Sequence, residues 1–365
     1  MNFYNELDKF SDKTALITEN CGAISYKNLL AVADQIAGHI ENRCLVFIVC
    51  KNCFESIAGY VGFQRAGVAI TLVDASIDDD LFLALLETYR PKYVYMPKEG
   101  QIDGIAFESV YSFENYVLLK SVKTVEYVLH RDLNLLLTTS GSTGSPKFVR
   151  QSYKNIDSQV VALAEYLGIT SDSRPITTMS MSFTYGLSII NSHFFKGALL
   201  ILTDASLVDP RFWSMLKENE ATTFGGVPFI YEILKKLRFG RMKLPSLKYI
   251  TQAGGKLNNK LTAEFAQICE EKSIDFYVMY GQTEATARIS YLPCEYAQTK
   301  VGSVGIPIPG GKMWLEDNEG NRIHSAGVSG ELVYQGDNVT LGYAEDYLDL
   351  AKGDENKGLL HTGDI

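Results

Sequence analysis

Short apolar runs alternate with amphipathic patterns through the first third of the chain. The apolar runs are rich in β-branched and aromatic residues, as in residues 44–50 (CLVFIVC), and the segments between them repeat their apolar positions at helical spacing. Strands are therefore predicted at residues 44–50, 68–74 and 92–96, and helices at 54–67 and 80–89. The alternation of strand and helix is typical of a parallel sheet covered by helices.

The same pattern resumes after residue 133 and changes again near residue 303. Strands are predicted at residues 133–139, 198–203 and 275–280, and helices at 155–166, 186–195, 209–219, 227–237 and 258–272. Beyond residue 303, glycine-rich turns separate short alternating runs such as 312–315 and 331–334. The pattern as a whole indicates an α/β protein with a small β-rich part at its end.

Residues 135–150 (LLLTTSGSTGSPKFVR) form the most informative segment. An apolar strand runs into a loop of glycine, serine and threonine that ends at Pro146 and Lys147. Backbone N–H groups, hydroxyls and one cation suit a polyphosphate, since glycine lets the backbone approach closely. The spacing excludes a Walker A loop, because Pro146 precedes Lys147 and the strand-like Phe148 follows. Composition alone leaves a phosphate loop and an ordinary surface linker equally open.

Four later segments favour the phosphate loop. They are residues 253–256 (AGGK), 280–284 (YGQTE), 330–332 (GEL) and 361–364 (HTGD). Together with residues 139–147 (TSGSTGSPK), and in this order, they resemble motifs of the ANL superfamily. That superfamily comprises acyl-CoA synthetases, luciferases and adenylation domains, which make acyl-AMP from a carboxylate and ATP. The resemblance covers essentially the whole chain and implies two doubly wound α/β subdomains with a small β-barrel-like subdomain.

The resemblance also implies roles for individual residues. The catalytic residues would be Lys147, Thr283 and Glu284, and Mg²⁺ would be held by Glu284 and Thr143. The nucleotide site would comprise Thr139, Ser140, Gly141, Ser142, Thr143, Gly144, Gly254, Gly255, Lys256, Tyr280, Gly281, Gln282, Thr283 and Asp364. The implied cofactors are ATP and Mg²⁺, with coenzyme A or a phosphopantetheine carrier as a further acceptor.

The strand predicted at residues 275–280 supports these roles on geometric grounds. It ends at a glycine, which should place Tyr280, Thr283 and Glu284 at the carboxyl edge of a sheet, where open α/β folds bind ligands. A single glutamate suits Mg²⁺, which takes oxygen ligands and usually needs only one or two carboxylates beside phosphates. By the resemblance, Tyr280 would flank adenine, Thr283 would meet the α-phosphate and Asp364 would bind the ribose hydroxyls. Without such neighbours, Glu284 would be an ordinary exposed turn residue.

The reaction implied by the resemblance needs no side-chain nucleophile. A carboxylate attacks the α-phosphate and expels pyrophosphate, and positioning and charge neutralisation provide most of the catalysis in such chemistry. The sequence contains no G-x-S-x-G elbow, no H-E-x-x-H and no histidine pair at metal-binding spacing. Among the five histidines, His361 is the one expected near the nucleotide, and His193 is expected to pack in a helix.

Residues 181–188 and 225–228 correspond to the acyl-pocket segments of the family. The acid would contact Phe183, Thr184, Tyr185, Gly186, Gly226 and Val227. Adenylation domains for amino acids commonly carry an aspartate after this aromatic residue, to pair with the substrate ammonium, whereas this chain has Thr184. Because an ammonium buried without a partner is costly, the substrate is predicted to be an acyl or aryl carboxylic acid rather than a standard α-amino acid.

Net charge and composition disfavour some classes of binding partner. The chain has 34 lysines and arginines against 43 aspartates and glutamates, which gives a net charge of -9 and disfavours nucleic acid and anionic membranes as partners. No apolar run approaches the ~18 residues of a membrane span, and no signal peptide is visible, so a cytoplasmic protein is predicted. A small-molecule acid, ATP and an acyl-carrier protein are the expected partners. The six cysteines, including the pair at residues 50 and 53, are expected to be reduced thiols.

The sequence ends at Ile365, within the last motif. Members of the superfamily continue into a smaller C-terminal domain with a lysine for adenylation. The expectation is therefore an N-terminal fragment without that lid domain, and the alternative is a natural protein that lacks it. Residues 1–300 would hold the two α/β subdomains and residues 301–365 the β-rich one. Such a chain would bind nucleotide and adenylate poorly. Two functions remain open: an AMP-forming ligase that passes the acyl group to coenzyme A, a carrier thiol or an amine, and a non-catalytic nucleotide or acyl-adenylate binding protein.

Overall fold

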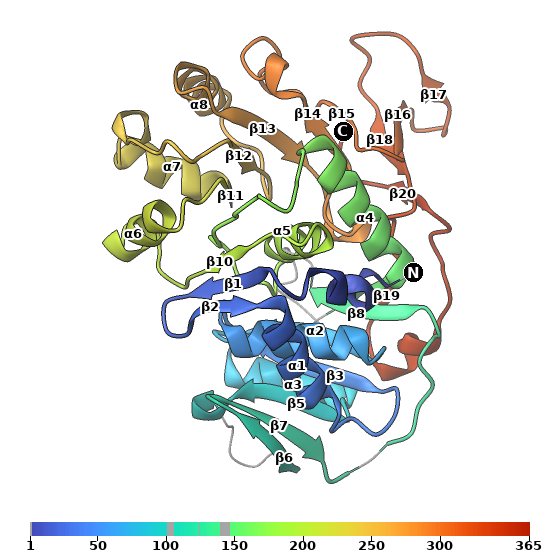
Figure 1. The fold of residues 1–365 in the computed structure, drawn as a ribbon. Coiled ribbons are helices and arrows are strands. Elements are labelled where there is room, and N and C mark those ends of the chain that lie inside the picture. Colours follow the sequence, from blue (N-terminus) through green and yellow to red (C-terminus); the bar gives the residue numbers. More distant parts are fainter. Residues whose placement is uncertain (1, 101–105, 124, 139–146) are drawn as a thin grey trace.

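The computed structural model describes residues 2–100, 106–123, 125–138 and 147–365. Within these residues the strands form four sheets, of eight, five, four and three strands, and helices cover and separate the two largest (Figure 1). No helix in the described part of the chain is long and apolar enough to cross a membrane.

The eight-stranded sheet has the order β19-β9-β8-β4-β3-β5-β7-β6. Its strands are β3 (Leu45–Cys50), β4 (Ala69–Asp74), β5 (Tyr93–Pro97), β6 (Phe107–Phe113), β7 (Tyr116–Ser121), β8 (Leu133–Thr138), β9 (Phe148–Ser152) and β19 (Gly342–Ala344). The four central strands, β8, β4, β3 and β5, are parallel, and the strands at both margins pair antiparallel.

Helices cover both faces of this sheet. Along β3, Val46, Ile48 and Cys50 face a core that α1 (Tyr26–Ala37) and α2 (Phe54–Arg65) complete. The alternate residues Leu45, Phe47 and Val49 pack on α3 (Asp79–Tyr89) on the opposite face. The continuous apolar run of residues 44–50 therefore reflects a strand that is buried on both faces.

The five-stranded sheet has the order β11-β12-β13-β14-β15. Its strands are β11 (Thr223–Gly226), β12 (Tyr249–Gln252), β13 (Asp275–Tyr280), β14 (Ser290–Leu292) and β15 (Ile306–Pro307). The first three strands are parallel and the last two are antiparallel. One face of this sheet packs on α6 (Pro210–Glu218), α7 (Pro228–Lys236) and α8 (Asn259–Glu271).

Two helices lie between the large sheets. These are α4 (Tyr153–Tyr166) and α5 (Thr184–Phe195), which Figure 1 shows at the centre of the molecule. On one side they contribute Ile156 and Leu187 to the core under β8, and on the other they contribute Leu163 and Tyr185 to the cores under the five-stranded sheet. Each large sheet is thus covered on both faces, as a doubly wound fold requires.

The remaining elements are short. A three-stranded sheet joins β10 (Leu200–Leu202), β1 (Thr14–Thr18) and β2 (Gly22–Ser25), and a four-stranded antiparallel sheet joins β17 (Arg322–Ile323), β16 (Lys312–Glu316), β18 (Glu331–Gln335) and β20 (Leu359–His361). The 3₁₀ helices are η1 (Phe3–Phe10), η2 (Lys98–Gly100), η3 (Phe239–Arg241), η4 (Thr283–Ala285), η5 (Cys294–Tyr296) and η6 (Tyr347–Ala351). The boundary predicted at residue 300 stays a prediction.

The elements predicted from the sequence are confirmed with small shifts of their ends, and the chain is a mixed α/β protein with a β-rich final part. Several elements were not predicted, notably α1, the β6–β7 hairpin and the short strands β11 and β12.

The cysteines of the described chain are free thiols, and Cys21 is exposed. Burial raises the pKa of Cys53 to about 11, so this thiol is protonated near neutral pH.

Candidate functional site

The carboxyl ends of three parallel strands meet at one edge of the five-stranded sheet. Gly226 ends β11, Gln252 ends β12 and Tyr280 ends β13, and Gly226 is in register with Gln252. Residues 253–256 and 280–284, which are predicted to bind nucleotide, follow β12 and β13, and the predicted acyl-pocket residues Gly226 and Val227 lie at the end of β11. Tyr280 therefore lies at the carboxyl edge of a sheet, as expected. This edge is where parallel α/β folds place their ligands.

The turn after β12 carries the second motif. Gly254 has a φ of +75°, a left-handed conformation that favours glycine, and a Cβ there would lie 3.0 Å from a methyl carbon of Val227. The side chain of Gln252 donates a hydrogen bond of 2.7 Å to the carbonyl of Gly255 and fixes the turn. Lys256 is exposed at its end. The turn therefore presents backbone, rather than side chains, beside the start of α7.

Two motifs that are eighty residues apart in the sequence meet at Tyr280. Its hydroxyl donates a hydrogen bond to the carboxylate of Asp364, which also accepts one from Gln282 at 3.0 Å. Gln282 holds the same turn through the carbonyl of Thr362 at 2.8 Å. Burial, followed by the nearby Asp364 carboxylate, raises the pKa of Tyr280, so its hydroxyl stays protonated and remains a donor. The structure thus fixes the direction of the Asp364 carboxylate.

A second junction joins Glu284 to Lys147 through β19. The hydroxyl of Tyr343 donates a hydrogen bond of 2.6 Å to Oε1 of Glu284. The ammonium of Lys147 lies 6.0 Å from the centroid of the same tyrosine ring and forms an ion pair of 2.7 Å with Glu345. Burial, and then the Glu284 carboxylate, raises the pKa of Tyr343. The carboxylate and the cation predicted to be catalytic therefore both lie next to one tyrosine.

Strand β19 is held in place by a buried arginine. The guanidinium of Arg150, on β9, is fully buried and pairs with Glu355. It also donates to the carbonyls of Leu341 at 3.0 Å and Tyr343 at 2.9 Å, on either side of the first β19 residue. Because a buried guanidinium must be paired and hydrogen-bonded, this arrangement accounts for an arginine inside the sheet and fixes the position of Tyr343.

Hydrogen bonds from Asn338 hold the turn that carries Thr283 and Glu284. The amide of Asn338 donates hydrogen bonds of 2.8 Å to the carbonyls of Ala285 and Arg288, and its own backbone carbonyl accepts from Thr286 at 2.6 Å. Asn338 is itself 3 % exposed. This buried amide satisfies the carbonyls of a tight turn and makes the turn rigid.

The predicted acyl-pocket residues occupy the start of α5 and the end of β11. Thr184 lies with its hydroxyl 3.4 Å from that of Thr283, which links the acyl segment to the nucleotide edge. Phe183, one residue earlier, is 53 % exposed. Tyr185 and Gly186 are buried; a Cβ at Gly186 would lie 2.3 Å from the carbonyl oxygen of Ser180, so close packing requires glycine there.

Some predicted residues lie outside the described part of the chain. They are Thr139, Ser140, Gly141, Ser142, Thr143 and Gly144. Elsewhere, among residues 2–100, 106–123, 125–138 and 147–365, no group of three or more histidine, cysteine or acidic side chains is placed to hold a metal. A magnesium ion does not need such a group, because it can be held by one protein carboxylate together with phosphate oxygens of the nucleotide. The half-buried Glu284 carboxylate could serve as that single protein ligand.

Three side chains near this edge were not anticipated: Tyr343, Glu345 and the buried Arg288. Tyr343 and Glu345 reach the site through a pairing of β19 with β9 that spans about two hundred residues of sequence, and local patterns carry no signal for such pairings.

His361 lies beside the last motif and forms a 3.5 Å pair with Glu331. His193 is buried on α5, as expected, and burial lowers its pKa to about 4.

Comparison with known proteins identifies the family of this chain. The family model "AMP-binding enzyme" matches residues 3–344. The 2-succinylbenzoate–CoA ligase of Bacillus cytotoxicus is 28 % identical over 352 residues, which cover 93 % of this chain and 69 % of that protein. A linear gramicidin synthase from Brevibacillus parabrevis is 26 % identical over 391 residues, which cover 100 % of this chain and 5 % of that protein. The chain therefore spans about two thirds of the ligase and a small part of the synthase.

Solved structures share the fold. One of O-succinylbenzoate coenzyme A synthetase from Bacillus subtilis, in complex with AMP, has a TM-score of 0.80 and 22 % identity, covering 99 % of this chain and 75 % of that one. A second structure, of the same synthetase with ATP and a magnesium ion, has a TM-score of 0.78 and 21 % identity. This match covers 99 % of this chain and 76 % of the synthetase chain. The chain has the fold of the N-terminal domain of such enzymes, and it belongs to the AMP-binding enzyme family within the ANL superfamily.

Proposed function

We propose that this chain forms the nucleotide- and acid-binding part of an ATP-dependent, AMP-forming carboxylate ligase. The observation that carries the proposal is the convergence of two distant motifs at the contact between Tyr280 and Asp364, at the carboxyl edge of parallel strands. Relatives named as a coenzyme A ligase and as a peptide synthase support the same class. Coenzyme A and a carrier-protein thiol are both acceptors in keeping with these names. A cytoplasmic location stays a prediction.

The roles proposed for the residues follow from their positions. Asp364, oriented by Tyr280 and Gln282, would accept hydrogen bonds from the ribose hydroxyls. Glu284, with Oε1 held by Tyr343, would offer its carboxylate to Mg²⁺. Lys147 would leave its ion pair with Glu345 and bind the phosphates of ATP instead. Breaking this ion pair costs little stability, because exposed ion pairs contribute little to the free energy of unfolding.

The proposed reaction forms one phosphorus–oxygen bond and breaks another. A carboxylate oxygen of the acid bonds to the α-phosphorus, and the bond to the β-phosphate oxygen breaks, so pyrophosphate leaves with the electron pair. No proton has to be removed, because the acid is already ionised near pH 7. The residues contribute orientation and opposing charge: Thr283, near the acyl segment, would hold the α-phosphate, and Lys147 would offset the charge on the phosphates.

Binding of AMP, and tighter binding of an acyl-AMP analogue, would test this proposal. We expect AMP and benzoyl-sulfamoyl-adenosine to raise the melting temperature, since a ligand at ~100 times its Kd stabilises the folded state by ~2.7 kcal/mol. The analogue should bind more tightly than AMP because it also occupies the acid site. Differential scanning fluorimetry and calorimetric titration measure both. Melting curves that do not move at millimolar AMP and saturating analogue would contradict the proposal.

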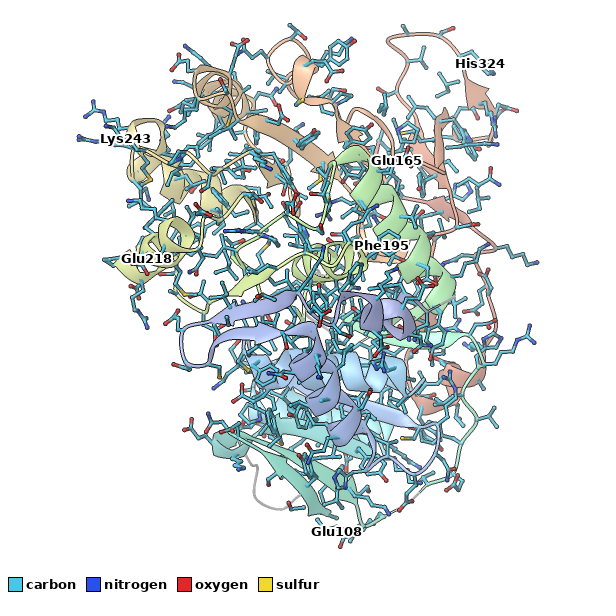
Figure 2. All side chains as sticks on the ribbon, viewed as in Figure 1. Glu108, Glu165, Phe195, Glu218, Lys243 and His324 are labelled. Carbon is cyan, nitrogen blue, oxygen red and sulfur yellow. The ribbon has the colours of Figure 1, made fainter. Side chains whose placement is uncertain are left out.

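Glu284→Gln tests the role proposed for the carboxylate. The substitution keeps the shape and removes the charge, so we expect ATP affinity in Mg²⁺ to fall by about tenfold, the loss of one charge-assisted interaction. The affinity for AMP without metal should change little. Glu218→Gln, at the exposed last residue of α6 (Figure 2), is the matched control. An equal loss of affinity for ATP and for AMP would instead mean that Glu284 stabilises the turn and does not bind the metal.

A further inference from the structure

The motif at residues 330–332 (GEL) lies at the start of strand β18, beside the turn at residues 361–364. The backbone N–H of Leu332 donates a hydrogen bond of 2.9 Å to the carbonyl of Asp364. The carbonyl of Leu332 accepts a hydrogen bond of 2.7 Å from the hydroxyl of Thr362. The two segments are thus paired beyond the last residue of β20, and the motif supports the turn that carries Asp364.

The side chain of Glu331 completes this support. Its Oε1 atom accepts a hydrogen bond of 2.9 Å from the backbone N–H of Gly363. Gly363 has a φ of +72°, a left-handed conformation that other residues adopt only at a cost. A hydrogen bond to a carboxylate is stronger than one between neutral groups, so Glu331 holds the turn firmly at its left-handed residue.

The strand pairing does not explain a glutamate at this position. Glu331 lies opposite Glu316 on β16, and like charges directly opposite each other destabilise an antiparallel pair. The carboxylate of Glu316 accepts a hydrogen bond from the indole of Trp314 instead. His361 lies 3.5 Å from Glu331, but both side chains are partly exposed, so this pair contributes little. Among the described residues, the N–H of Gly363 is therefore the partner that fixes the Glu331 carboxylate.

The position of this turn determines where the Asp364 carboxylate lies. Tyr280 and Gln282 both donate to its Oδ2 atom, so the described residues leave Oδ1 to accept from a ligand hydroxyl. These donors come from the end of β13 and the turn after it, whereas Glu331 and Leu332 belong to the four-stranded sheet. The side chain of Asp364 is thus held from one sheet and its backbone from another. Without the hydrogen bond to Glu331, the turn could rotate about the side-chain contacts.

We propose that Glu331 is a positioning residue of the nucleotide site, which holds the turn at residues 361–364 so that Asp364 meets the ribose hydroxyls. The inference rests on the proposed function and assigns a role to the motif at residues 330–332. Glu331 does not contact the ligand and acts on binding through Asp364. Loss of its carboxylate therefore weakens the binding of ligands that carry ribose hydroxyls and leaves the binding of ligands without them unchanged.

Glu331→Ala and Glu331→Gln test the proposal with AMP and with 2′,3′-dideoxy-AMP, which lacks both ribose hydroxyls. In calorimetric titrations, Glu331→Ala should weaken AMP binding by about five- to twentyfold and change the affinity for dideoxy-AMP by less than about twofold. Glu331→Gln keeps an acceptor for the N–H of Gly363, so its AMP affinity should stay within about threefold of the wild type. Glu316→Ala, at the opposite position on β16, is the matched control and should leave both affinities within about twofold.

Glu331→Asp gives a second test, which does not depend on the folding of Glu331→Ala. The aspartate keeps the charge, but its shorter side chain does not reach Gly363, so it should lose as much AMP affinity as Glu331→Ala. Wild-type AMP affinity in Glu331→Asp, or an equal loss of affinity for AMP and dideoxy-AMP, would overturn the proposal. If AMP does not bind to the wild-type chain, the proposed function fails and this inference fails with it. AMP binding that none of the Glu331 variants weakens overturns this inference alone.

Discussion

Asp364→Asn is expected to weaken AMP binding by about ten- to hundredfold, because each hydrogen bond from a hydroxyl to a charged acceptor contributes ~1.5 to 3 kcal/mol. In the structure, Tyr280 and Gln282 already donate to this carboxylate and set its direction. An asparagine side chain has a single acceptor oxygen, so the two internal donors and the ribose hydroxyls would compete for it.

The stability of the chain should be almost unaffected by this substitution. Asp364 is exposed in a turn after β20, and exposed turn substitutions usually change the free energy of unfolding by less than ~0.5 kcal/mol. Calorimetric titration with AMP gives the affinity, and chemical denaturation gives the stability. Asp172→Asn, at another exposed turn, is the matched control. An AMP affinity that equals that of the wild type would remove Asp364 from the nucleotide site.

The elements that hold the site could be predicted where burial is strong and local. Strand β13 is a clear case, because its apolar run ends at a glycine and so places Tyr280 and Glu284 at a sheet edge. Strand β3 is another, because both of its faces are buried and its run is apolar throughout. In such segments the local pattern and the tertiary environment require the same residues.

The contacts that complete the site could not be predicted in this way. Tyr343 meets Glu284 only because β19 adds antiparallel to β9, and such long-range pairing leaves no mark on a three-residue strand. Arg288 lies four residues beyond Glu284 and would ordinarily be taken as an exposed cation, since arginines are mostly exposed. The turn anchored by Asn338 directs it inward instead. The resemblance gave roles for single residues, whereas the structure gives their partners.

Gly281→Ala is expected to have the largest effect on stability of any substitution considered in this chain. A Cβ at residue 281 would lie 2.0 Å from the carbonyl oxygen of Ala287 and 2.7 Å from the Cα atom of Arg288, and both are backbone atoms that cannot rotate away. The turn cannot easily move either, because Asn338 holds the carbonyls of Ala285 and Arg288. We expect the free energy of unfolding to fall by about 1 to 3 kcal/mol, the usual cost of overpacking a buried site.

The same substitution should also weaken ligand binding in the molecules that stay folded. Any shift that relieves the contact would move Tyr280 relative to Thr283, so the groups proposed to hold the adenine and the α-phosphate would no longer match one ligand. We expect AMP affinity to fall by at least about tenfold, since small misplacements of positioning groups are costly. Gly240→Ala is the matched control, because a Cβ at this exposed position meets Ile268 at an ordinary 3.7 Å. A Gly281→Ala chain with wild-type stability and AMP affinity would show that the turn relaxes freely and that its close packing does not position the site.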